Sequence, residues 1–138
     1  MSLPASLKLE LVTPEKLLIS LPVDEVSYRT AKGYVGILPG HVPMLTTLEI
    51  GVLSYRSGKE SHAVAVSTGF VEVLPDRVIV MADTAEKDDE IDRVRAQAAK
   101  QDAESKLRQG GSEDEFLIQR ARVERAVARL DVAAYHQH

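Results

Sequence analysis

The chain of 138 residues contains no cysteine and no tryptophan, and aromatic residues make up only 4% of it. Without thiols there are no disulfides, no zinc thiolate site and no cysteine nucleophile, which suits a cytosolic protein. With so few aromatics, the 44% hydrophobic content predicts a core of Val, Leu, Ile and Ala. The net charge of −4 is mild and predicts no general attraction to nucleic acid or to an anionic membrane.

Long apolar runs are also missing. The longest contain a handful of residues, far below the roughly 20 that a membrane-spanning helix needs. The first residues lack the basic and apolar regions of a secretory signal. We therefore expect no direct membrane insertion, so that any membrane association comes through a partner.

Catalytic motifs are absent from the sequence as well. It has no Walker A sequence and no Gly-x-Gly-x-x-Gly run, and none of its histidines accompanies a nucleophile motif; they are His41, His62, His136 and His138. Two ligands at the end of the chain, His136 and His138, make a poor metal site. The sequence thus predicts no catalytic residue, no metal site and no required cofactor.

Glycine and proline are unevenly distributed along the chain. All six prolines and six of the eight glycines lie at or before Pro75, and only Gly110 and Gly111 follow it. This change from turn-rich to helical sequence predicts an α+β protein with two domains. An antiparallel two-sheet β-sandwich is expected over residues 1–85 and an antiparallel α-helical hairpin over residues 86–138.

Short alternating segments separated by turn residues predict the strands of the first domain. They cover residues 7–11, 26–29, 48–56, 61–66, 70–74 and 78–82. In segment 36–45, His41 lies between the two prolines, Pro39 and Pro43. A Pro-Gly turn ends a strand there, and the second proline keeps the chain from continuing as a central strand. We expect the His41 ring to bond backbone groups that the prolines leave unpaired.

The second domain has recognisable helix signals. Three acids, at residues 88–90, predict the start of the first helix, and Gly110-Gly111 its end. Ser112 followed by Glu115 predicts a capping box for the second helix. Apolar stripes are expected on the first helix at Ile91, Val94 and Ala98 and at Ala96, Ala99, Ala103 and Leu107, and on the second at Phe116, Val123, Val127, Leu130 and Ala134. Alanine buries little area, so we expect a weakly held hairpin that can detach.

A basic stripe marks the second helix. Arg122, Arg125 and Arg129 share one face at positions i, i+3 and i+7. One interpretation is a solvated face with interspersed acids such as Glu124. The other is a contact with phosphate or carboxylate groups, which guanidinium binds in bidentate fashion.

Several segments in order resemble the epsilon subunit of bacterial F-type ATP synthase. They are residues 36–45, Ile50-Gly51-Val52, residues 69–73 and residues 82–85, followed by the helical hairpin. The resemblance implies a non-catalytic rotor subunit that couples the gamma subunit to the ring of c subunits. It also implies a location on the cytoplasmic face of the bacterial membrane, peripheral and within the ATP synthase.

The resemblance implies particular contact residues. Lys32, Tyr34 and His41 correspond to the edge facing the c-ring, and Tyr34 stands where many relatives carry an acid. The hairpin is implied to act as a brake: folded down it permits turnover, and extended it inhibits ATP hydrolysis. Arg122, Arg125 and Arg129 are then the contacts with the alpha/beta catalytic head.

A regulatory ATP is the last implication of the resemblance. Residues 91–96 are similar to the ATP motif of some relatives, and the implied contacts are Glu86, Ile91, Asp92, Ala96, Arg125 and Arg129. Asp102 stands where the family has an arginine, and its carboxylate would repel phosphate. The alternative for residues 91–96 is an ordinary cap and charge pattern. The alternative for the whole chain is a stand-alone sandwich adaptor whose helical arm recruits another protein.

Overall fold

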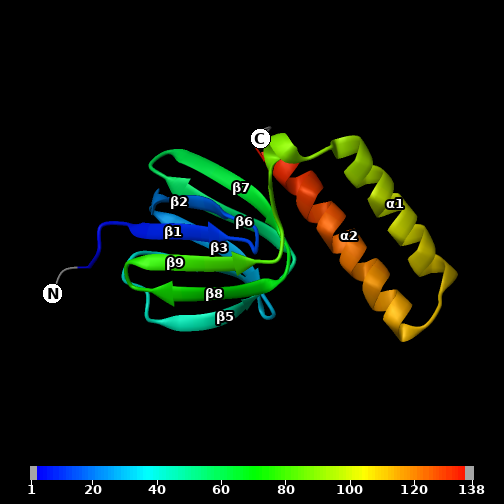
Figure 1. The fold of residues 1–138 in the computed structure, drawn as a ribbon, viewed down its shortest axis with the longest axis horizontal. Coiled ribbons are helices and arrows are strands. Elements are labelled where there is room, and N and C mark those ends of the chain that lie inside the picture. The colour runs from blue at the N-terminus through cyan, green and yellow to red at the C-terminus, as the bar shows by residue number, and fades with distance from the viewer. Residues whose placement is uncertain (1–2, 136–138) are drawn as a thin grey trace.

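The computed structural model describes residues 3–135, so His136 and His138 lie outside the described residues. Figure 1 shows a β-sandwich with a two-helix hairpin at one end of it, and α2 lies between the sandwich and α1. The predicted order of a sandwich followed by an antiparallel hairpin is confirmed.

Within residues 3–135 the strands form two five-stranded sheets. The first, in spatial order, holds β2 (Leu17–Val23), β1 (Leu7–Val12), β9 (Arg77–Ala82), β8 (Gly69–Leu74) and β5 (Met44–Leu48). The second holds β10 (Ala85–Lys87), β7 (Glu60–Val66), β6 (Gly51–Ser57), β3 (Glu25–Thr30) and β4 (Gly33–Ile37). Neighbouring described strands pair antiparallel, except that β1 and β9 are parallel.

The core follows from the alternation of side chains along each strand. In β1, Leu7, Leu9 and Leu11 are fully buried, whereas Lys8 and Glu10 point to the other face. The core is aliphatic as predicted, with one large exception. Tyr28 is buried and its hydroxyl lies 2.8 Å from the Thr46 hydroxyl, while burial raises the pKa of the Tyr28 phenol.

Two expectations about the strands need correction. The predicted strand over residues 48–56 is two strands, because β5 ends at Leu48 and β6 begins at Gly51 in the other sheet. The two residues between them let the chain cross the sandwich. The sequence patterns also gave no sign of β2, β5 and β10, the last being only three residues long, whereas the strand expected to end before the Pro-Gly turn is β4.

Residues 38–43 connect β4 to β5, which are edge strands of different sheets. The second proline therefore precedes an edge strand, as predicted. Gly40 has φ +85°, a conformation that favours glycine, and its N–H donates to the Pro75 carbonyl over 2.8 Å. His41 Nδ1 lies 2.7 Å from the carbonyl of Val42, the residue before Pro43, so the predicted backbone contact of this ring is confirmed.

The first long helix starts later than predicted. Residues Asp88–Glu90 form a single 3₁₀ turn, and α1 covers Arg93–Gln109. Asp92 is its N-cap, because the Asp92 carboxylate accepts from Arg95 N–H over 3.0 Å. The expected domain boundary at 85/86 falls within β10, which pairs with β7.

The second helix starts and ends close to prediction. Helix α2 covers Glu113–Ala133, and its N-cap hydroxyl, on Ser112, accepts from Glu115 N–H over 3.2 Å. Gly110 and Gly111, with φ of +78° and +144°, make the reversal between the helices. Neither helix within the described residues is long and apolar enough to cross a membrane.

The apolar faces of both helices differ from prediction. On α2 the buried residues are Ala126, Ala128 and Val132, while Phe116 of the predicted stripe is 51% exposed. On α1 Ala96 and Ala103 are buried as expected, but Val94 is 81% exposed. Helix α2 packs on β6 and β7 through a small cluster that we term the docking patch: Ala63, Ala65, Ala128 and Val132, with Val52, Ile91 and Tyr135 at its margin.

Candidate functional site

A pocket of about 330 Å³ lies where β10, the start of α1 and the C-terminal half of α2 meet. We term it the Glu86 pocket. Its lining residues are Glu86, Glu90, Asp92, Arg95, Ala96, Ala99 and Arg129. The structure thus brings together four of the six residues expected to contact ATP, namely Glu86, Asp92, Ala96 and Arg129.

An ion pair crosses this pocket. Arg129 Nε lies 2.8 Å from Glu86 Oε1, and both side chains are about one-third exposed, at 34% and 32%. The pair joins α2 to the strand that ends the sandwich. Asp92 serves as the cap of α1, and the Glu90 carboxylate accepts from Lys87 N–H over 3.1 Å. The pocket therefore holds three carboxylates and two guanidinium groups. Its carboxylates neutralise part of the positive charge of the guanidinium groups.

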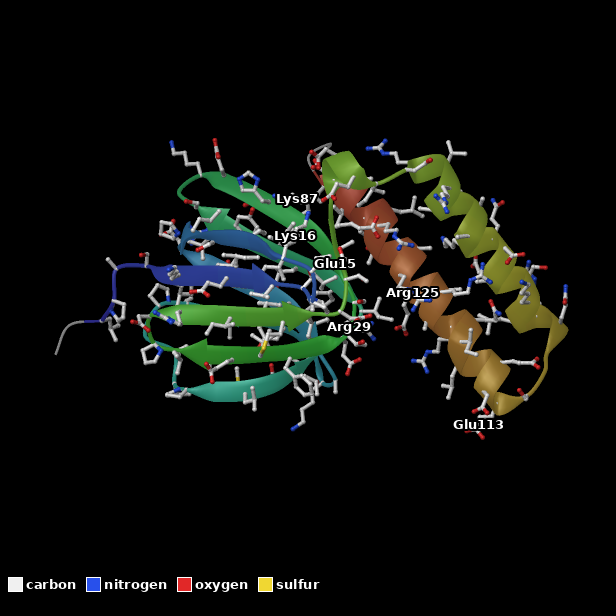
Figure 2. All side chains as sticks on the ribbon, viewed as in Figure 1. Glu15, Lys16, Arg29, Lys87, Glu113 and Arg125 are labelled. Carbon is white, nitrogen blue, oxygen red and sulfur yellow. The ribbon has the colours of Figure 1, made fainter. Side chains whose placement is uncertain are left out.

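Two expected ATP contacts do not line the pocket. Ile91 packs at the margin of the docking patch instead. Arg125 lies on α2 (Figure 2), and within residues 3–135 its guanidinium makes no ion pair or hydrogen bond, unlike those of Arg122 and Arg129. It is the member of the basic stripe that stays available while the hairpin is closed.

Asp102 has a partner that the sequence did not reveal. Its Oδ2 lies 3.0 Å from Arg122 Nη2, across the hairpin, and 3.2 Å from Lys106 Nζ on its own helix. The hydrogen bonds to Arg122 and Lys106 lower the pKa of the Asp102 carboxyl. The acid that was expected to repel phosphate therefore joins α1 to α2, and Arg122 and Lys106 compensate its charge.

The residues expected at the c-ring edge are spread along the edge strand β4 and its two flanking turns. Lys32 lies in the turn between β3 and β4 and Tyr34 near the start of β4, whereas His41 follows the opposite end of β4. A five-residue strand separates the two ends by roughly 15 Å. The Tyr34 hydroxyl accepts from Val52 N–H over 3.1 Å, although the side chain is 56% exposed.

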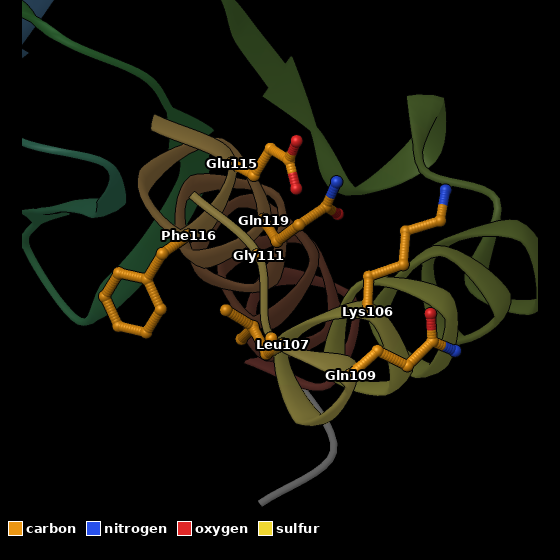
Figure 3. A pocket seen from close by; sticks show the side chains of 8 residues that line it. Lys106, Leu107, Gln109, Gly111, Glu115, Phe116 and Gln119 are labelled. Carbon is orange, nitrogen blue, oxygen red and sulfur yellow. The ribbon is translucent and has the colours of Figure 1, made fainter. Parts of the chain in front are cut away.

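Another contact between the domains has no signal in the sequence. Arg29 on β3 and Glu124 on α2 approach to 3.7 Å, next to a separate pocket of about 330 Å³. No local pattern marks such a pair, because its members lie on different domains. A further open pocket at the hairpin tip contains no expected site residue; its lining is Lys106, Leu107, Gln109, Gly110, Gly111, Glu115, Phe116 and Gln119 (Figure 3).

This geometry defines a class of protein: a β-sandwich domain that carries a small helical hairpin, docked through alanines and ion pairs. In the part of the chain that the structure describes, no three His, Cys, Asp or Glu side chains are placed so that they could hold one metal ion.

Comparison with known proteins gives the family. Residues 6–88 match the ATP synthase delta/epsilon chain β-sandwich domain, and residues 89–134 match the long α-helix domain of the same chain. The chain therefore belongs to the ATP synthase delta/epsilon chain family. This confirms the resemblance seen in the motifs and the expectation of a non-catalytic accessory subunit of ATP synthase.

Individual relatives agree with this assignment. The chain is 49% identical over 128 residues to an ATP synthase epsilon chain of Citrifermentans bemidjiense, covering 92% of this chain and 93% of the relative. It is 46% identical over 128 residues to ATP synthase epsilon chain 2 of Syntrophotalea carbinolica, with the same two coverages, 92% and 93%.

Solved structures share the fold. A chain in the cryo-EM structure of Euglena gracilis mitochondrial ATP synthase, described as OSCP/F1/c-ring in rotational state 1, superposes with a TM-score of 0.83 at 24% identity. The match covers 100% of this chain and 85% of that one. A chain from the central stalk and c-ring of the Tetrahymena thermophila enzyme gives a TM-score of 0.62 at 14% identity, covering 96% of this chain and 99% of that one.

Proposed function

We propose that the chain is a rotor subunit whose sandwich joins the gamma subunit to the c-ring and whose hairpin regulates ATP hydrolysis. Family membership supports the assembly, and so do the two fold neighbours, which come from ATP synthase structures that include the c-ring. In this assembly the chain lies on the cytoplasmic face of the bacterial membrane as a peripheral subunit. The edge strand β4, with Lys32 and Tyr34 near one end and His41 beyond the other, is assigned to the ring.

The observation that carries the regulatory role is the composition of the docking patch. Three of its four buried members are alanines, at positions 63, 65 and 128. At about 25 cal/mol per Å² such small side chains contribute little on burial. The free energy that holds the hairpin down is therefore small, and a partner with modest preference for the extended form can shift the equilibrium.

The basic stripe supports the same role because its partners are internal in the closed form. Arg122 pairs with Asp102 and Arg129 with Glu86. Extension of the hairpin separates α2 from both acids, so the stripe gains the ability to meet carboxylates on the alpha/beta catalytic head. Closed and extended forms then compete for the same guanidinium groups, which is the arrangement that a reversible brake needs.

Removing the hairpin tests the brake. In the assembled ATP synthase, a chain ending at Lys87 should raise ATP hydrolysis several-fold, because nothing is left to reach the head. Retention of gamma and c-ring by the truncated subunit is the control for assembly. Unchanged ATP hydrolysis in a correctly assembled enzyme would contradict the proposed brake but not the proposed rotor role. If a pull-down of the full chain recovers no ATP synthase subunit, the adaptor alternative is favoured.

We further propose that the Glu86 pocket binds ATP and so favours the closed form. Arg129 and Arg95 supply the charge for the phosphates, and Arg125 lies one helical turn before Arg129. The phosphates must then compete with Glu86 for Arg129, since these side chains are paired without ligand. Binding in this pocket bridges β10, α1 and α2, so it stabilises the docked hairpin by mass action.

Calorimetry of the isolated chain tests the nucleotide proposal. Arg129→Ala should weaken ATP binding by about tenfold or more, because it removes a charged donor to phosphate. The control is Arg108→Ala, which removes an exposed arginine in the last turn of α1, outside the pocket. It should leave the affinity for ATP unchanged. No heat and no thermal stabilisation by ATP in the unaltered chain would contradict ATP regulation. The brake, tested separately by truncation, would remain.

A further inference from the structure

The ion pair between Arg29 and Glu124 links the sandwich to the hairpin at a place where the two are not closely packed. Arg29 Nη1 lies 3.7 Å from Glu124 Oε2, and their side chains are 35% and 30% exposed. Figure 2 shows Arg29 at the end of the sandwich that faces the hairpin. Both residues line an open pocket between the domains, together with Thr30, Ala31, Glu49, Leu117, Arg120 and Ala121.

The pair lies beyond the docking patch. Ala128 and Val132, the α2 members of that patch, follow Glu124 by one and two helical turns. The residues of α2 before Glu124 are exposed to a large degree, with Leu117 and Ile118 at 53% and 57%. Arg29–Glu124 is thus placed to hold the N-terminal half of α2, which the apolar cluster does not reach.

Arg29 is positioned before the hairpin arrives. The same Nη1 donates to the Ile50 carbonyl over 2.9 Å, and the Arg29 carbonyl accepts from Glu49 N–H, also over 2.9 Å. These contacts lie within the sandwich, so they persist when the hairpin leaves. A guanidinium fixed in this way loses little conformational entropy when it meets a carboxylate.

Glu124 also keeps a partner in either state. Its Oε1 lies 3.4 Å from Arg120 Nε, one turn earlier on the same helix. Release from Arg29 therefore leaves neither charge unpaired: Glu124 retains Arg120, and Arg29 retains the Ile50 carbonyl. The contact can open without the penalty that accompanies an isolated buried charge.

We propose that Arg29 and Glu124 form an electrostatic latch that holds α2 on the sandwich. Salt, or a carboxylate of a partner protein, releases this latch. This deepens the proposed brake by giving its closed form a specific, screenable contact. The latch is a property of the isolated chain, so its failure and the failure of the brake are distinguishable.

The absence of cysteine from the sequence supplies a clean reporter. Ala65→Cys places a single thiol in the docking patch, where the native side chain is 7% exposed. Its labelling rate under native conditions is proportional to the undocked population of the full chain. Glu124→Gln or Arg29→Gln in this background should raise the rate about two- to fivefold, the effect of a partly exposed ion pair.

Four controls make the result specific. Glu10→Gln breaks a Lys8–Glu10 pair that also measures 3.7 Å but lies on β1, and it should leave labelling unchanged. Arg120→Gln should not raise the rate, because it leaves Arg29–Glu124 intact. The swap Arg29→Glu with Glu124→Arg should label more slowly than either single reversal. Higher ionic strength should accelerate labelling more in the reporter chain that keeps Arg29 and Glu124 than in the reporter chain with Glu124→Gln.

Opposite results overturn the latch. The latch is contradicted if Glu124→Gln and Arg29→Gln leave the labelling rate of the reporter unchanged. It is also contradicted if the effects of the two charge reversals on the labelling rate simply add in the double variant. An equal acceleration by Arg120→Gln and Glu124→Gln would assign the effect to helix stability alone and would also end the proposal.

Discussion

Gly69→Ala is expected to lower the free energy of unfolding of the sandwich by about 3 kcal/mol, near the upper end of overpacking effects. A Cβ built on Gly69 would lie 1.8 Å from the carbonyl oxygen of Met81. Both residues belong to paired strands, β8 and β9, and the obstructing atom is backbone. The strands must therefore separate locally, which weakens their ladder at the position where Gly69 faces Ala82.

Urea unfolding of the full chain measures this loss, and Gly36→Ala is the matched control. Gly36 is also a strand glycine, in β4, but its nearest contact for a Cβ is Glu25 Oε2 at 4.0 Å. The control should change the unfolding midpoint little. Equal midpoints for the two variants would contradict the close approach of β8 and β9. Gly69 begins one of the motifs that carried the family resemblance, and this contact gives a physical reason for glycine there.

The sandwich was predictable wherever strands alternate and turns are marked. Strand β1 follows an uninterrupted apolar–polar alternation, and a turn separates β6 from β7 in the gap between the expected segments 48–56 and 61–66. Strand β2 was missed because two leucines begin it and Pro22 lies inside it, so no alternation is visible. The crossing after Leu48 was missed because the apolar sequence continues while the chain changes sheets.

The hairpin was predictable as two helices, but its docking face was not. Periodicity weighted by large side chains selects Phe116, Val123 and Val127, yet the residues that meet the sandwich are Ala128 and Val132. An alanine contact carries a weak hydrophobic signal in the sequence and becomes evident only when the partner strand is known. In the same way, the acids at residues 88–90 indicate a helix start, but a 3₁₀ turn uses them and Asp92 caps α1.

The candidate site was predictable in part for a related reason. The resemblance selected Glu86 and Arg129, which are 43 residues apart, and the structure pairs them. What the sequence could not show is how the remaining charges are used. Asp102 looked like a repulsive acid until its contact with Arg122 was visible, and Arg29 had no recognisable role before Glu124 was placed beside it.

Ala128→Glu is expected to undock the hairpin almost completely. Ala128 is 4% exposed on the face of α2 that meets Ala63 and Ala65. An unpaired buried carboxylate costs about 3–5 kcal/mol, and an alanine-lined contact cannot offset it. The labelling rate of the Ala65→Cys reporter should therefore rise to nearly that of a fully accessible thiol, because this cost exceeds the small free energy that holds the hairpin down.

The matched control for this variant is Ile118→Glu, which adds the same charge to the same helix at a side chain that is 57% exposed. It should leave the labelling rate of the isolated chain within about twofold, since exposed substitutions have small effects. A slow rate in Ala128→Glu would contradict the docking geometry itself. In the assembled enzyme, Ala128→Glu should lower ATP hydrolysis, because the closed form is no longer available to compete with the extended brake. Fast labelling with unchanged ATP hydrolysis would support the docking patch and contradict the brake. The labelling rate therefore tests how the hairpin is held, and ATP hydrolysis tests what the released hairpin does.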